Sequence, residues 1–126
     1  MLSVPVPLSE VVDRLTILQI KRQRISDPQK RARAESWALA LEEAWDHAGL
    51  PELPELPEHA ALSEVNAALW EIEDRLRARE ARRDFGPGFV QDARSVYQLN
   101  DRRARLKAEL DARLGSGLVD VKTHPS

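Results

Sequence analysis

The chain has 126 residues, of which 42% are hydrophobic and 32% charged, and its 19 basic and 21 acidic residues give a formal net charge of −2. This length suits one domain with a single core, and the near balance of charge argues against a long electrostatic track for nucleic acid. Because the chain has no cysteine, disulfides, thiolate metal sites and cysteine catalysis are excluded.

The N-terminal segment, residues 1–8, lacks the basic start and apolar centre of a signal peptide. No apolar run approaches the roughly 20 residues that span a bilayer, so we expect a cytoplasmic protein with no membrane span.

A first helix is predicted at about 10–25, capped by Ser9. Its apolar stripe comprises Val11, Val12, Leu15, Ile17, Leu18, Ile20 and Ile25. This helix should be central in the fold.

A second helix is predicted at about 28–48. Asp27 followed by Pro28 is typical of a helix start, and Gly49 of a helix end. Its buried face is expected to comprise Ala34, Trp37, Ala38, Leu41, Ala44, Trp45 and Ala48. A face so rich in alanine and tryptophan is typical of a core or of a homodimer interface, and we expect a homodimer.

The second half of the chain is also predicted to be helical. Prolines at every third position of 51–57 favour a stiff, extended connector. Helices are then expected at about 58–83 and 88–114. Residues 118–121 are expected to form a short extended or docked tail, and no sheet is expected because a second strand is not evident. The predicted fold class is all-α, a four-helix bundle or paired helical hairpins in a single domain.

A row of polar side chains stands out in the third predicted helix. Asn66, Trp70, Glu73, Arg77 and Glu80 recur at intervals of four, three, four and three, which places them on one helix face beside an apolar row. A half-buried carboxylate or amide without a partner costs about 1–3 kcal/mol. Either the fold or a ligand must therefore satisfy these groups.

The fourth predicted helix adds a second polar group around Asn100, which interrupts an otherwise apolar inner row. An asparagine at such a seam either fixes helix register or binds a ligand. Arginines fork onto anions, and Trp and Tyr rings offer flat faces for a sugar or base. The expected ligand groove comprises Asn66, Trp70, Glu73, Asp74, Arg77, Arg94, Tyr97, Asn100, Asp101 and Arg103.

Two pairs of acids indicate a possible metal site. Glu10 with Asp13, and Glu71 with Asp74, lie one helical turn apart. If their helices pack together, four carboxylates would converge on Mg²⁺, as in hydrolases of nucleotide phosphoanhydrides. The alternative is structural, because the first pair favours the helix dipole and Glu71 can pair with Arg75. The histidines lack zinc-ligand spacing and are expected to be solvated: His47, His59 and His124.

Four segments resemble an uncharacterised bacterial family of small helical proteins, known as domain of unknown function 6165. They are LSEVVDRLTILQIKRQRI (8–25), NAALWEIEDRLRARE (66–80), ARSVYQLNDRRA (93–104) and GSGLVDVK (115–122). The likeness covers nearly the whole chain except the second helix and the connector. The polar spacing in 66–80 is also similar to a second family of unknown function from polysaccharide gene clusters.

The resemblance implies a role in surface-glycan assembly, since some members are fused to glycosyltransferases. It suggests nucleotide sugars or phosphorylated sugars as ligands and a glycosyltransferase as a partner. Members often have Lys where this chain has Arg14, and an acid where it has Gln19. The glutamine weakens any scheme that needs a carboxylate at position 19. Our preferred hypothesis is a small helical binding or accessory protein. The alternatives are a magnesium-dependent hydrolase and a purely structural interaction module.

Overall fold

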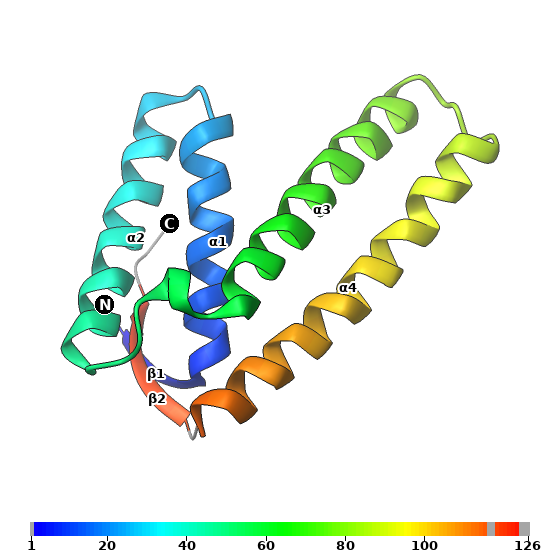
Figure 1. Ribbon diagram of the computed structural model, residues 1–126. Helices are drawn as coiled ribbons and strands as arrows, with labels where there is room; N and C mark the ends of the chain where they lie inside the picture. Colours follow the sequence, from blue (N-terminus) through cyan, green and yellow to red (C-terminus); the bar gives the residue numbers. More distant parts are fainter. Residues whose placement is uncertain (1, 116–117, 124–126) are drawn as a thin grey trace.

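The protein is an all-α arrangement of two helical hairpins with a small β-ribbon (Figure 1). The computed structural model describes residues 2–115 with their side chains and 118–123 as backbone. The helices are α1 (Leu8–Arg24), α2 (Pro28–His47), η1 (a 3₁₀ turn, Leu53–Glu55), α3 (Pro57–Ala81) and α4 (Pro87–Leu114), and the strands are β1 (Leu2–Pro7) and β2 (Leu118–Thr123). The predicted all-α class is confirmed, and each long helix lies within two residues of its predicted bounds.

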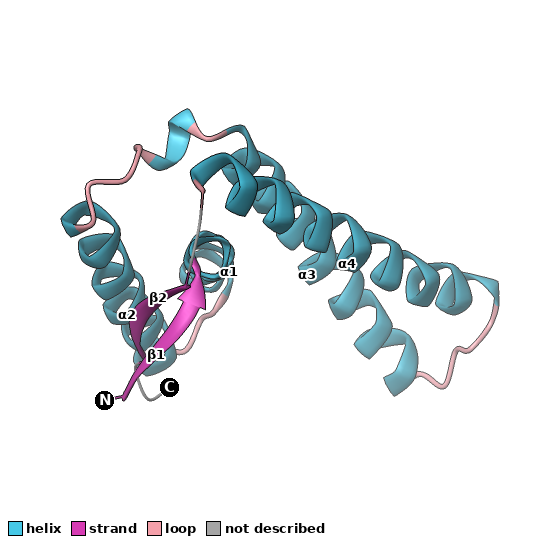
Figure 2. Ribbon diagram, turned by 90° about the horizontal axis from the view of Figure 1, so that it is seen from below, coloured by secondary structure: helices cyan, strands magenta, loops and turns pink. Residues whose placement is uncertain are grey.

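The two hairpins share only part of their length. Helix α1 lies between α2 and α3, and the hairpin of α3 and α4 continues beyond it to a free end, as both views show (Figures 1 and 2). We call residues 75–105, the distal part of this hairpin, the arm. Paired hairpins therefore describe the architecture better than a closed bundle. No helix in residues 2–115 has the length and apolar character needed to cross a membrane.

Local signals explain the start of α2 and the end of α4, and one predicted cap is an exception. The Asp27 side chain accepts a hydrogen bond from Gln29 N at 2.9 Å, and Gly115 ends α4 with φ +60, as expected for these cap residues. The exception is Ser9, which lies inside α1 and not at its cap. The Asp111 carboxylate of α4 instead accepts from Ser9 N at 2.9 Å and Ser9 Oγ at 2.7 Å. A carboxylate from another helix thus caps α1.

The main core lies between α1, α2 and the base of α4. Its buried residues are Leu8, Val11, Val12, Leu15, Leu18, Ala34, Ala38, Leu41, Trp45, Leu56, Leu62 and Leu110. Helix α1 is central, as predicted. Two residues predicted to be buried on α2, Ala44 and Ala48, are exposed, and Trp37 is half-buried, although Trp45 between the two alanines belongs to the core.

The β-ribbon corrects the prediction that no sheet would form. Strands β1 and β2 pair antiparallel, from Leu2 with Thr123 to Pro7 with Leu118. The prolines of β1 are typical of a loop and argued against a strand. Pro5 and Pro7, however, are two residues apart. Their missing N–H groups therefore lie on the same edge of the strand, which can be the unpaired one. The connector 51–57 also differs from a fully extended segment, since it contains η1.

Candidate functional site

The polar row of α3 changes character along the helix. Asn66 is buried and Trp70 half-buried, whereas Glu73, Asp74 and Arg77 are exposed. The Arg77 side chain is 73% exposed, and its guanidinium lies 3.1 Å from the Asp74 carboxylate and 3.9 Å from the Glu73 carboxylate. The row begins at Asn66, which α1 covers, and continues on to the arm. There its charged groups are exposed and pair with one another. It does not point into a shared hollow.

Asp13 is the centre of a buried network that uses the first residue of that row. Its side chain Oδ1 accepts from Asn66 Nδ2 and from Arg103 Nε, both at 2.9 Å, and Oδ2 accepts from a second Arg103 nitrogen at 2.5 Å. Asn66 Nδ2 also donates to Thr16 Oγ1 at 2.8 Å, and this hydroxyl donates to the Asp13 backbone carbonyl at 2.7 Å. Both amide hydrogens of Asn66 are therefore used within the fold.

The network keeps Asp13 charged despite its burial. Burial raises the pKa of Asp13, but hydrogen bonds from Arg103 and Asn66 and the charges of Arg103 and Lys107 outweigh it, so the pKa lies below its usual value. The same contact raises the pKa of Arg103. Asn66 and Arg103, two of the predicted ligand residues, are thus committed to joining α1, α3 and α4.

The remaining predicted ligand residues lie on the exposed surface of α4. Arg94, Tyr97, Asn100 and Asp101 are all exposed, so the predicted inward position of Asn100 is wrong. Its Oδ1 accepts only a long contact of 3.4 Å from Arg103. This asparagine lies one helical turn before Arg103 of the buried network.

The four carboxylates proposed for magnesium are not brought together as a set. Lys107 pairs with Glu10, Arg103 with Asp13, and Glu71 lies 2.5 Å from Arg24. The fourth acid, Asp74, pairs with Arg77. Within the described residues, no three acidic or histidine side chains are placed to hold a metal ion. The donor set does not fit the shared cation, because each carboxylate faces a cationic side chain.

The histidines also show no metal-site geometry. His47 is exposed and His59 half-buried, and burial lowers the pKa of His59. His124 lies outside the described residues.

Trp45 belongs to the core, with 4% of its surface exposed, and its indole N–H donates to the Pro51 carbonyl at 2.8 Å.

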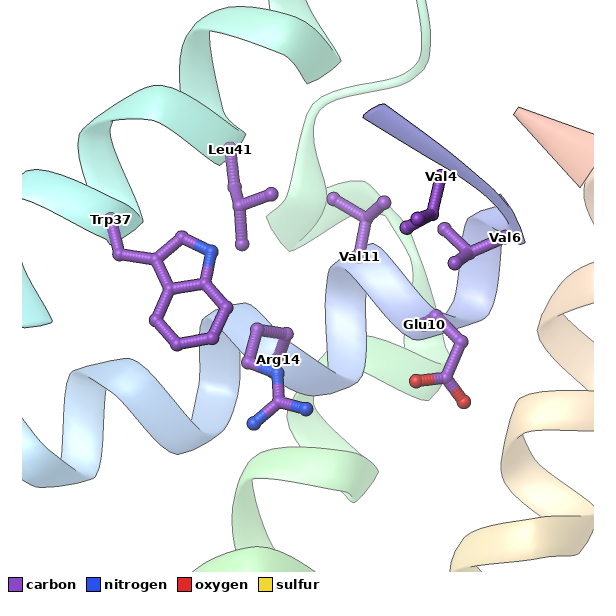
Figure 3. Close-up of a pocket in the computed structure, with 7 residues that line it drawn as sticks. All are labelled: Val4, Val6, Glu10, Val11, Arg14, Trp37 and Leu41. Carbon is purple, nitrogen blue, oxygen red and sulfur yellow. The ribbon is translucent and has the colours of Figure 1, made fainter. Parts of the chain in front are cut away.

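A groove between β1, α1 and α2 brings together residues that, apart from the predicted metal ligand Glu10, the sequence analysis did not assign to a ligand site (Figure 3). Its volume is about 230 Å³, and its lining comprises Val4, Val6, Glu10, Val11, Arg14, Trp37 and Leu41. The Arg14 guanidinium carbon lies 5.2 Å from the centre of the Trp37 ring. Because both residues lie about equally far from the turn at 25–27, the antiparallel hairpin of α1 and α2 places them side by side, and this pairing could have been predicted.

The lining of this groove includes one cationic and one anionic side chain, Arg14 and Glu10. Lys107 pairs with Glu10 on the side facing α4. Arg14 makes no ion pair or hydrogen bond with another side chain in residues 2–115 and has only its contact with Trp37. An arginine stacked on an aromatic ring keeps its in-plane N–H donors available. The groove thus combines a donor fork, an aromatic wall and an apolar wall.

No family model, curated protein or solved structure matches the chain. The resemblance to the bacterial helical family and the predicted homodimer therefore stay predictions.

Proposed function

We propose that this protein is a small binding or accessory protein that holds an anionic sugar or nucleotide in the groove of Arg14 and Trp37. The observation that carries the proposal is the Arg14 guanidinium, which lies over the Trp37 ring at 5.2 Å and makes no ion pair with an acid in residues 2–115. A phosphate or carboxylate is the natural ligand of such a fork, because it accepts two parallel hydrogen bonds.

The rest of the groove suits the uncharged part of such a ligand. Val4, Val6 and Leu41 supply apolar surface to the groove, and sugar rings and bases have apolar faces that pack on such surfaces. The volume of about 230 Å³ is small for a drug-sized ligand. We infer that the site holds one phosphorylated sugar unit or one base, with the remainder outside.

The link to surface-glycan assembly rests on the resemblance of residues 8–25, 66–80, 93–104 and 115–122 to the bacterial helical family. In that setting the ligand is a nucleotide sugar or sugar phosphate, and a glycosyltransferase is the partner that uses it. The proposal is a binding function and includes no bond-breaking step.

Thermal unfolding with a panel of nucleotide sugars and sugar phosphates tests the proposal. A ligand at a hundred times its Kd stabilises the native state by about 2.7 kcal/mol, which raises the Tm of a domain of this size by about 10 °C. The Arg14→Met variant should lose this shift. The matched control is Arg33→Met, which removes an exposed arginine of α2 outside the groove.

Two results would overturn the proposal. The first is the absence of any shift across the panel with the wild-type protein. The second is a shift that survives in Arg14→Met but is lost in Arg94→Met, which would place the ligand on the arm. Quenching of tryptophan fluorescence gives an independent measurement, and it should disappear in Trp37→Phe if the ligand lies against that ring.

A further inference from the structure

Charge is strongly segregated along this chain. Residues 34–74 contain eleven acidic residues and no lysine or arginine, whereas the arm contains nine arginines and four acidic residues. The near-zero net charge therefore hides two regions of opposite sign. The two regions adjoin within α3, but their far ends lie apart, since the loop joining α3 to α4 and the connector joining α2 to α3 are at opposite ends of the molecule (Figure 1).

The basic end has a projecting, ordered tip. Phe85 is 53% exposed and packs edge-on against Phe89, with ring centres 5.3 Å apart. Asp84 fixes the loop, because its carboxylate accepts from Arg79 at 2.9 Å and from Gly86 N at 3.2 Å. The preceding residue, Arg83, has φ +56, a left-handed conformation that is uncommon for a residue with a side chain.

The arginines beside Phe85 are available for contacts. Arg82 and Arg83 are exposed, and their guanidinium groups make no ion pair or hydrogen bond with a side chain in residues 2–115. An exposed aromatic side chain flanked by cations, on a loop held in one conformation, needs little ordering to bind.

The acidic end contains a groove of complementary character. It lies beside the end of α2, has a volume of about 230 Å³, and is lined by Glu42, Trp45, Asp46, Glu52, Leu53 and Pro54. Trp45, Leu53 and Pro54 supply apolar surface, and the three acids form no ion pair with a described basic side chain. This volume accommodates one large side chain.

We propose that the tip of one copy, with Phe85 between its arginines, docks into the acidic groove of a second copy. One chain cannot make this contact with itself, because its tip and groove are at opposite ends. Apolar burial of Phe85 supplies affinity, and the pairing of Arg82 and Arg83 with the rim acids supplies orientation. The contact joins two different surfaces, so it repeats head to tail into a ring or a filament.

Sedimentation velocity on the full chain tests the proposal, with charge-reversed variants of each end. A contact of this size is weak, so we expect association that grows with concentration and falls between about 0.05 and 0.5 M salt. The tip variant is Arg82→Glu with Arg83→Glu, and the groove variant is Glu42→Lys with Glu52→Lys. Each should weaken association by at least about tenfold, because like charges then face each other.

Mixing the two variants gives the decisive measurement. The intact tip of the groove variant fits the intact groove of the tip variant, and the two reversed ends are also complementary. Association should therefore return in the mixture. Lys30→Glu with Arg33→Glu, at the start of α2, changes the net charge as much as the tip variant does; it is the matched control for that variant and should associate like the wild type. Phe85→Ser should weaken association without a change of charge.

A monomer at all concentrations and salt conditions would overturn the proposal. So would association that both end variants leave unchanged, since that indicates a different interface, or two monomeric variants whose mixture stays monomeric. Circular dichroism of each variant verifies its fold, so a failure to associate is not confused with unfolding.

Discussion

Replacing Arg103 with methionine tests the buried contact that joins α4 to α1. The guanidinium donates two hydrogen bonds to Asp13, at 2.9 and 2.5 Å, and the Asp13 side chain is 3% exposed. Removing one partner of a buried ion pair costs roughly 3–5 kcal/mol because the other charge stays buried. Lys107, whose ammonium lies 3.9 Å from Asp13, compensates in part. We expect the free energy of unfolding at pH 7 to fall by about 2–4 kcal/mol.

The pKa of Asp13 makes this loss depend on pH. In the wild type the lowered pKa gives stability that is present above the unfolded pKa of about 3.9 and lost as the pH falls through the lower folded pKa. The Arg103→Met variant lacks the main contact that lowers the pKa of Asp13, whereas burial still raises it. We therefore expect the pKa of Asp13 in this variant to lie above its usual value. Protonation then stabilises the variant. The difference in free energy of unfolding between the wild type and the variant should therefore become smaller as the pH falls from 7 to about 4.

Urea unfolding at both pH values measures these free energies. Arg22→Met is the matched control, because Arg22 lies 3.4 Å from Glu35 in a partly exposed pair and should contribute at most about 1 kcal/mol. A loss below about 1 kcal/mol in Arg103→Met, or a loss of equal size at both pH values, would refute the reasoning from a buried charge.

Three other substitutions test the cap of α1, the end of α4 and the hydrophobic core. Asp111→Ala removes the acceptor of Ser9 N and Oγ, and urea unfolding should show a loss of about 1–2 kcal/mol, with a smaller loss in Asp111→Asn. Gly115→Ala places a side chain at φ +60 and should cost about 1 kcal/mol, seen as a lower Tm. Leu15→Ala, at a position 1% exposed, should cost about 2–5 kcal/mol with an unchanged denaturant m-value.

The helix boundaries could be predicted because their signals are local. Pro28 follows the side-chain cap of Asp27, and Gly115 ends α4 in the left-handed conformation. A proline or glycine at such a position acts on its own backbone whatever the rest of the chain does. The β-ribbon was not predictable in this way, since β1 pairs with a strand more than a hundred residues later in the sequence.

The polar residues show where the sequence is ambiguous. Asn66 and Glu73 share one helix face, yet Asn66 is buried and Glu73 exposed. Helical spacing determines which face a residue occupies, but not where along that face another helix ends. That limit is set by α1, which covers Asn66 and then diverges from α3. The contact of Arg14 with Trp37 is not evident from the periodicity of either helix alone, but it follows once the two helices are paired about the turn at 25–27.

The buried network also explains how two hairpins with separate packing faces keep one relative orientation. The hydrophobic effect has no preferred direction, whereas the hydrogen bonds of Asp13 to Asn66 and Arg103 have fixed directions. Each donor comes from a different helix of the second hairpin, so a shift of either helix would break a bond to a buried charge. The network therefore fixes α3 and α4 against α1 together. In this arrangement the arm projects as one unit, and its tip and the groove at the end of α2 stay at opposite ends of the molecule.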